Sequence, residues 1–161
     1  MKYTRLTKEQ LEELHPEFIN FLATQSITAE EWKEIKTNRP EVAEEEIDVF
    51  SDLVWEGVLE KATFLEHFSK DQIHLFKLLP NEMRLIAIKV ENNTIDITTQ
   101  EGYDWLRQNL LDDSVLFYNA TKSYSEDKNL DKFKIIQQGA SITKGDLYRY
   151  FEKIMDHKNN D

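Results

Sequence analysis

The sequence contains no cysteine among its 161 residues, which excludes disulfide bonds, thiolate chemistry and cysteine-ligated zinc or iron–sulfur centres. It contains only four glycines and three prolines, too few for a collagen-like, linker-rich or low-complexity chain. No apolar run approaches the ~20 residues of a membrane span, and the N-terminus lacks the apolar segment of a secretory signal. These absences predict a cytoplasmic protein without membrane contact.

What remains is the composition of an ordinary folded protein, 40% hydrophobic and 32% charged. A chain of this length suits one domain and buries roughly two thirds of its unfolded surface. We therefore expect a single domain over residues 1–155. The polar residues 156–161 are predicted to form a disordered tail.

Negative charge is concentrated in residues 7–60. This segment contains fifteen acids and four bases, whereas residues 61–161 contain 16 acids and 14 bases. Binding to nucleic-acid phosphates or anionic lipid requires a basic face, so we expect neither. An acidic surface is compatible with a basic protein partner. It is also compatible with plain solvated helix faces, because glutamate is a good helix former.

The same acidic segment is predicted to be helical. Thr7 with Gln10, and Thr28 with Glu31, have the spacing of capping boxes, and apolar residues follow each pair at helical intervals. Pro16 interrupts the first apolar stripe, and proline is tolerated only near the start of a helix. We therefore expect Pro16 to kink the first helix or to split it in two.

The longest predicted helix spans Pro40 to Leu65, and we expect it to be the central element of the fold. Its buried stripe is predicted to consist of Ile47, Phe50, Val54 and Val58. Leu53, Trp55 and Leu59 lie off this stripe, which predicts burial on more than one side. Glycine in a helix costs about 1 kcal/mol relative to alanine, so Gly57 suggests that another backbone packs closely there.

After residue 61 the hydrophobic pattern alternates, as in strands. Thr63–Phe68 is a predicted strand, and Gln72–Leu79 with Met83–Val90 predicts a β-hairpin whose second strand is central. The pieces Thr94–Thr98 and Ser114–Asn119 are also predicted to be extended. A helix capped by Thr98 is predicted between these two, and this strand–helix–strand unit is expected to form a right-handed crossover.

Residues 125–155 return to helical spacing. One helix is predicted to begin at Ser125–Asp127 and to stop at Gly139, and a second to begin at Thr143 with Asp146. The predicted fold class is therefore α+β. It has N-terminal helices over residues 7–60, a small, mostly antiparallel sheet with one helix over 61–120, and C-terminal helices over 125–155.

The first candidate site is the acidic run Glu44, Glu45, Glu46 and Asp48. No base occurs between Pro40 and Glu60, so these acids have no ion-pair partner within their own helix. Like charges at such spacing destabilise a helix by a few tenths of a kcal/mol. We expect this run to dock a basic protein, and the alternative is a solvated helix face.

The second candidate site is the pair His67 and His74 on two predicted neighbouring strands. Two imidazoles with a carboxylate from Glu66 or Asp71 would make a metal site or an acid/base pair. However, adjacent residues of a strand point to opposite faces, so half-buried structural histidines are the alternative. We assign no metal, no cofactor and no catalytic residue.

The sequence contains no GxGxxG, GxxxxGK[ST], GxSxG or HExxH motif, the usual signatures of nucleotide binding, nucleophilic catalysis and zinc proteolysis. This favours a non-enzymatic interaction or regulatory protein that docks a basic partner. The alternatives are a small enzyme or ligand-binding protein using His67 and His74, and an acidic mimic of nucleic acid.

Five segments together cover nearly the whole chain: LTKEQLEELHPEFINFLATQSITAEEW, SDLVWEGVLEKATFLEHFS, LIAIKVEN, DITTQEGYDWL and ITKGDLYRYFE. They resemble an uncharacterised family of small acidic bacterial proteins. The resemblance implies a stand-alone, single-domain protein of the bacterial cytosol. That family has no assigned activity, so the resemblance assigns no functional residue to this chain.

Overall fold

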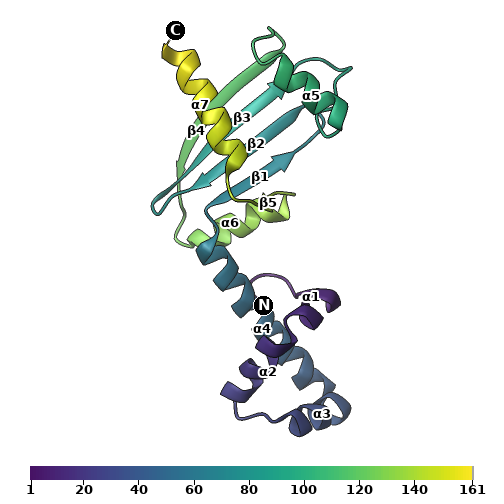
Figure 1. Cartoon of the computed structure of the whole chain (residues 1–161). Helices are drawn as coiled ribbons and strands as arrows, with labels where there is room; N and C mark the ends of the chain where they lie inside the picture. Colours follow the sequence, from purple (N-terminus) through teal and green to yellow (C-terminus); the bar gives the residue numbers. More distant parts are fainter. Residues whose placement is uncertain (161) are drawn as a thin grey trace. The chain divides into compact units, whose positions relative to one another are not determined.

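The computed structural model describes residues 1–160 of the chain. The chain divides into two compact units, Met1–Glu60 and Lys61–Asp161. Within the described residues, the first unit is helical and the second contains a five-stranded antiparallel sheet with three helices (Figure 1). This arrangement confirms the predicted α+β class.

Four helices form within residues 8–61, and local sequence signals explain where they begin. They are α1 (Lys8–Glu13), α2 (His15–Thr24), α3 (Ala29–Asn38) and α4 (Pro40–Lys61). Both predicted capping boxes are present, at Thr7 and at Thr28. Pro16 lies in the first turn of α2, so the proline splits the helix rather than kinking it.

The core of the first unit is aromatic and packs on one side of α4. The ring of Phe18 lies 5.0 Å from that of Phe50 and 5.1 Å from that of Trp32, both edge-on. The buried members of this core are Leu6, Phe18, Leu22, Trp32, Ile35, Ala43 and Phe50. Of the predicted stripe of α4, Phe50 is buried in this core, and Ile47 and Val54 are partly buried against it.

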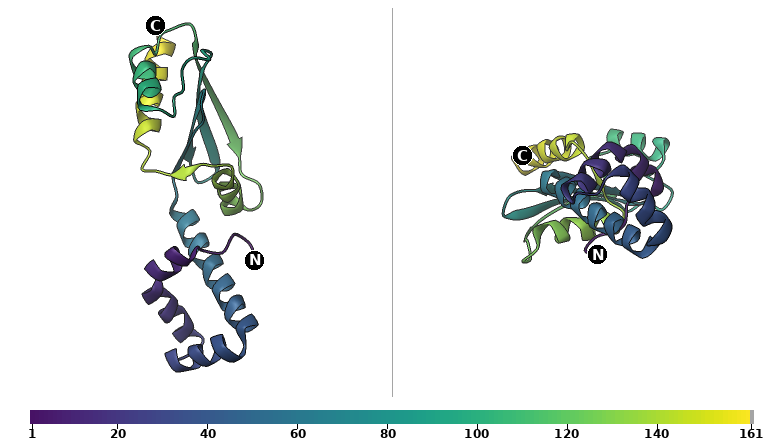
Figure 2. Two further views of the ribbon diagram at one scale, coloured as in Figure 1. Left: turned by 90° about the vertical axis from the view of Figure 1, so that its right-hand side faces the viewer. Right: turned by 90° about the horizontal axis from the view of Figure 1, so that it is seen from below.

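Around and beyond Val54 the prediction for this helix holds only in part. Leu59 is fully buried and Trp55 is partly buried, as predicted, whereas Leu53 is 58% exposed and Val58 is 41% exposed. These two side chains are exposed because α1, α2 and α3 lie on one side of α4 only (Figure 2). The expected close backbone at Gly57 is also absent from the described residues, since a Cβ built there meets no atom within 4 Å.

The second unit contains the sheet. Its strands are β1 (Phe64–Phe68), β2 (Gln72–Leu78), β3 (Glu82–Val90), β4 (Val115–Ser123) and β5 (Ser141–Ile142), in the order β4-β3-β2-β1-β5. The predicted hairpin is β2–β3, and β3 lies inside the sheet as expected. The two-residue β5, which pairs with β1, is not predicted from the sequence.

The segment from Thr94 to Thr98 forms turns rather than a strand. The side chains of Asn92 and Asp96 accept hydrogen bonds from the backbone N–H groups of Thr94 and Thr98, each at 3.0 Å, and such local bonds favour turns. The helix cap is consequently Thr99 rather than Thr98.

The predicted right-handed crossover is also wrong. The segment predicted as its first strand, Thr94–Thr98, is not a strand. The strand that precedes the intervening helix is β3, and β4 runs antiparallel to it, whereas a crossover of that kind joins parallel strands.

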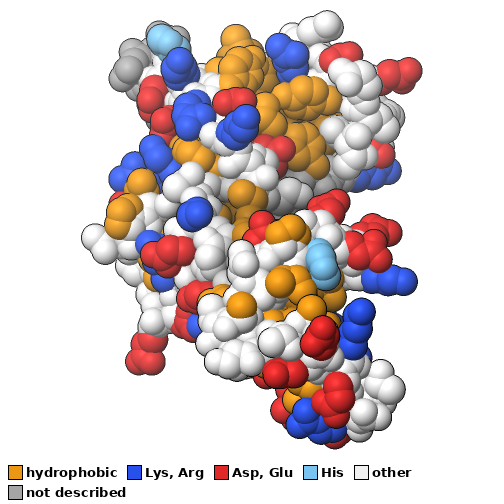
Figure 3. All heavy atoms as spheres, turned by 60° about the horizontal axis from the view of Figure 1, so that its bottom comes forward, with side chains coloured by type: hydrophobic (Ala, Val, Ile, Leu, Met, Phe, Trp, Pro, Cys, Tyr) orange, Lys and Arg blue, Asp and Glu red, His pale blue; other side chains and the backbone are white. Residues whose placement is uncertain are grey.

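Helices cover both faces of the sheet unequally. α5 (Gln100–Gln108) and α7 (Asp146–Asn160) lie on one face and α6 (Lys128–Gln137) on the other (Figure 2). The larger core, which includes Ile73, Ile88, Leu106 and Phe151, lies under α5 and α7. Figure 3 shows hydrophobic side chains reaching the surface among charged ones on the side that carries α5 and α7.

The C-terminal helix continues past the expected end of the domain. α7 extends to Asn160, so residues 156–160, predicted to be a disordered tail, have helical backbone, and Asp161 lies outside the described residues. None of the helices in the described part of the chain combines the length and the apolar composition that a membrane crossing requires.

Candidate functional site

Four carboxylates of α4 form a row along one line of the helix. Glu44, Asp48, Asp52 and Glu56 follow one another at intervals of four residues, and side chains at this interval lie above one another on a helix. Each therefore repels its neighbour unless a cation or a hydrogen-bond donor lies between them. We call these four residues the carboxylate row.

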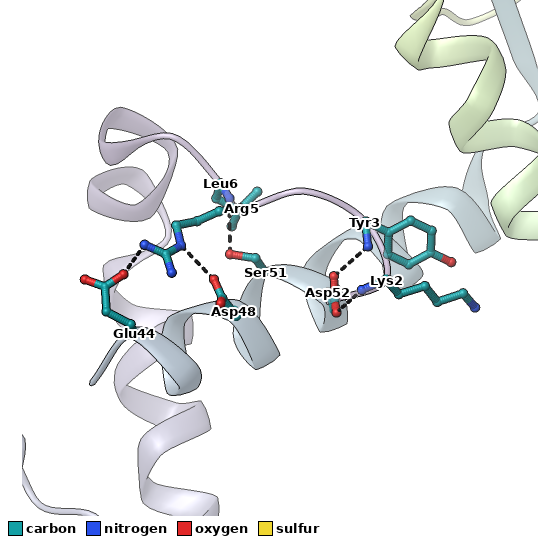
Figure 4. Close-up of polar contacts among 8 residues, drawn as sticks. All are labelled: Lys2, Tyr3, Arg5, Leu6, Glu44, Asp48, Ser51 and Asp52. Carbon is teal, nitrogen blue, oxygen red and sulfur yellow. Dashed lines mark hydrogen bonds and ion pairs between the residues drawn. The ribbon is translucent and has the colours of Figure 1, made fainter. Parts of the chain in front are cut away.

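The extended N-terminal arm, residues 1–6, supplies those donors (Figure 4). The guanidinium of Arg5 donates to Asp48 Oδ1 from Nε at 2.7 Å, and it also donates to Glu44. The backbone N–H groups of Lys2 and Tyr3 donate to the two oxygens of Asp52, at 2.7 and 2.9 Å. The acids thus fasten the start of the chain to α4.

The apolar side chains of the arm strengthen this attachment. Tyr3 and Leu6 are 8% and 7% exposed, and the backbone N–H of Leu6 donates to the buried Ser51 Oγ at 3.1 Å. The phenol of Tyr3 donates to the carboxylate of Glu56. Burial, together with this hydrogen bond, raises the pKa of Tyr3 to about 12.

The structure assigns the four predicted docking acids to three different surroundings. Glu44 and Asp48 bind Arg5. Glu46 is half-buried, and its Oε2 is enclosed with no hydrogen-bond partner among the described residues. Glu45 is exposed, and the described part of the chain provides no ion pair for it. Sequence reasoning missed Arg5 because it lies 39 residues from Glu44.

The outward line of α4 next to this row combines one carboxylate with apolar side chains. Glu45, Val49, Leu53 and Gly57 also follow at intervals of four, and all four are exposed. Val49 is 56% exposed and Leu53 is 58% exposed. We call these four residues the α4 stripe. The sequence contains a signal for this exposed line, because Leu53 falls outside the predicted buried stripe of the same helix.

The two candidate histidines are neighbours in space. His67 on β1 and His74 on β2 lie directly opposite each other in the antiparallel register, so both point to the α6 face. His74 Nε2 lies 2.9 Å from Gln72 Oε1. Burial, and secondarily His67, lower the pKa of His74, which favours the neutral imidazole.

Among the described residues, no carboxylate completes this pair. Glu66 precedes His67 on the same strand and therefore points to the opposite face, where burial raises the pKa of its carboxyl. Across the residues that the structure describes, no group of three or more His, Asp or Glu side chains is arranged to hold a metal ion. Within residues 1–160, the pair therefore offers two imidazoles to a ligand without a carboxylate to complete a metal site.

Comparison with curated proteins and with solved structures gives no match. The model of a family of unknown function (DUF6495) matches residues 1–156. That range includes the N-terminal arm, the whole of α4 and the complete sheet. Because the match spans nearly the entire chain, the protein belongs to this family of unknown function, DUF6495.

Proposed function

We propose that this protein is a non-enzymatic interaction protein of the bacterial cytoplasm that binds a basic partner through the α4 stripe. The observation that carries the proposal is the exposure of Val49 and Leu53, at 56% and 58%, which follow the exposed Glu45 on successive turns of α4. Isolated apolar side chains on a surface are common. Val49 and Leu53 lie four residues apart, on the same line of α4, and so present two neighbouring apolar side chains to a partner.

The charge around the stripe favours a basic partner. Residues 7–60 contain fifteen acids and four bases, and the arm leaves Glu45 without a cation. A partner segment with one or two apolar residues flanked by lysine or arginine complements both features. A second copy of this chain is disfavoured because each copy carries a net charge of -11.

The carboxylate row has a different role in this proposal. Glu44, Asp48 and Asp52 already accept hydrogen bonds from the arm. In this proposal they attach the arm to α4 and do not contact the partner. Neutralising Glu44 or Asp48 would release Arg5 and disturb the arm. A clean test therefore changes Glu45, Val49 and Leu53 and leaves the row intact.

The test uses a labelled synthetic amphipathic peptide of leucine and lysine, with binding followed by fluorescence anisotropy at low and high salt. Val49→Ser with Leu53→Ser is expected to weaken binding at least about tenfold, and Glu45→Gln to weaken it less and to reduce its salt dependence. Leu111→Ser is the matched control, because Leu111 is 79% exposed and lies in the other unit.

Two outcomes decide the proposal. Unchanged affinity of the double serine variant contradicts it, as does equal loss in the Leu111→Ser control. Affinity purification from the native host, with parent and double variant side by side, then identifies the natural partner. A DNA-binding protein recovered only by the parent would point to the nucleic-acid-mimic form of the same docking role.

A further inference from the structure

Strand β4 is a long edge of the sheet with little protection against pairing. The sheet ends at β4 on one side and at the two-residue β5 on the other. β4 has nine residues, six of them exposed, and its only charged residue is Lys122. Natural sheets protect such edges with proline, bulges, charged side chains or a covering segment. At β4 the described residues provide Lys122 alone for this purpose, and the register with β3 contains no bulge.

One side of the β4 backbone lacks hydrogen-bond partners. The strand pairs with β3 over its whole length, from Val115 opposite Val90 to Ser123 opposite Glu82. In an antiparallel edge strand, half of the N–H and C=O groups point away from that neighbour. Within the described residues, no other segment bonds the backbone of residues 116–122.

Two hollows flank this edge, one on each face, at the same point along β4. On the α7 side a hollow of about 260 Å³ is lined by Asn119, Thr121, Tyr148, Glu152 and Asp156, among others. On the α6 side a hollow of about 570 Å³ is lined by apolar side chains with lysines beside them. Its apolar lining is Phe76, Met83, Leu85, Ala120 and Ile135, and its charged lining includes Lys122, Lys134 and Asp131.

We call the first the acidic hollow and the second the apolar hollow. In the acidic hollow, Glu152 and Asp156 have no ion pair among the described residues, and the one cation lining it, Arg84, binds Glu82 at 3.1 Å. A basic side chain fits there. The floor of the second hollow favours an aliphatic or aromatic side chain.

We propose that β4 binds an extended peptide of another protein, in which basic and apolar residues alternate, as an added strand of the sheet. Successive side chains of a strand point to opposite faces, so a strand beside β4 directs a basic residue to the acidic hollow and its neighbour to the apolar hollow. Backbone bonds supply affinity and the two hollows supply specificity, as in other strand-addition complexes.

A second copy of this chain fits the edge less well. The β4 strand of a second copy offers a single base, Lys122. If two β4 strands paired, this lysine would lie either near Lys122 and Lys134 in the apolar hollow of the first copy, where like charges repel, or outside the acidic hollow. Both copies also carry the net charge of -11. The β4 site lies wholly in the second unit and does not depend on the α4 stripe.

The test measures binding of a capped Lys–Val repeat peptide to the full chain by fluorescence anisotropy. A second peptide of the same sequence has its backbone nitrogens methylated on one edge, which removes donors without removing charge. Glu152→Gln with Asp156→Asn is the site variant, and Glu101→Gln, an exposed acid on α5, is the matched control.

The proposal expects at least about tenfold weaker binding to the site variant, unchanged binding to the control, and loss of binding by the methylated peptide. The Val49→Ser and Leu53→Ser variant should bind like the parent, which separates this site from the α4 stripe. Equal binding of the methylated peptide, or no effect of the site variant, overturns the proposal. So does sedimentation of the chain as a dimer that dissociates when Thr121 is replaced by proline.

Discussion

Two glycines of this chain occupy opposite kinds of surroundings. A Cβ built on Gly102, in the first turn of α5, falls 1.8 Å from the carbonyl oxygen of Asp96, which no side chain tolerates without movement of the backbone. A Cβ built on Gly57, in the interior of α4, meets nothing within 4 Å. The same substitution therefore has opposite expected effects at the two positions.

Gly57→Ala is expected to raise the free energy of unfolding by about 0.5–1 kcal/mol, because glycine loses more backbone freedom than alanine in a helix. Gly102→Ala is expected to lower it by about 1–3 kcal/mol through overpacking. Urea denaturation followed by circular dichroism measures both. A destabilising Gly57→Ala would mean that a neighbouring segment occupies the space above that residue.

At the scale of elements, the N-terminal arm and α4 behave as one structure. The arm contributes two buried side chains, Tyr3 and Leu6, and its polar groups meet acids that would otherwise repel one another along the helix. Because the contacts of Arg5 are exposed ion pairs, which contribute little individually, the burial of Tyr3 and Leu6 is the larger contribution.

The raised pKa of Tyr3 predicts how this attachment responds to alkali. A group whose pKa is about 12 in the folded chain, against about 10 when unfolded, keeps its full stabilising contribution below pH 10. That contribution is lost as the pH rises from 10 to 12, because the unfolded chain releases the proton first. Burial also raises the pKa of Tyr103, Tyr124 and Tyr148, so the loss is shared.

The substitution Tyr3→Phe isolates the contribution of the arm to this loss of stability in alkali. The variant is expected to be less stable than the parent near neutral pH, since Glu56 loses the hydrogen bond from the Tyr3 hydroxyl, and to lose less stability than the parent between pH 10 and 11. Urea unfolding monitored by tryptophan fluorescence at several alkaline pH values tests this. Parallel losses in the two proteins would show that Tyr3 titrates normally.

At the scale of the whole molecule, the dominant feature is unbalanced charge. The chain has 31 acids against 20 bases, and the bases of the first unit that form ion pairs do so at exposed sites. Self-repulsion of this kind destabilises the compact state, and added salt screens it over the Debye length.

Raising NaCl from about 10 mM to about 500 mM is therefore expected to raise the melting temperature, because screening relieves more repulsion than attraction. Glu45→Gln should melt slightly higher than the parent at low salt and respond less to added salt. Differential scanning calorimetry is the measurement. A melting temperature that falls with salt would mean that ion pairs such as Arg5 with Glu44 and Asp48 outweigh the repulsion.

Much of the local structure follows from the sequence because its causes lie within a few residues. Thr7 and Thr28 cap helices with partners three positions away, Pro16 ends one helix and starts another, and the alternation in β2 and β3 predicts the hairpin. The segment Thr94–Thr98, wrongly predicted to be a strand, also has a local cause. The side chains of Asn92 and Asp96 accept hydrogen bonds from its backbone and so favour turns.

By itself, then, the sequence determined the α+β class, most helix and strand positions and the acidic character of residues 7–60, since capping, periodicity and composition act locally. Only the tertiary structure decided that Arg5 meets Glu44 and Asp48, that His67 faces His74, that Val49 and Leu53 remain exposed, and that β4 ends the sheet. These outcomes depend on which distant segments pack together. Packing is set by the burial of whole faces, which no short window of sequence contains.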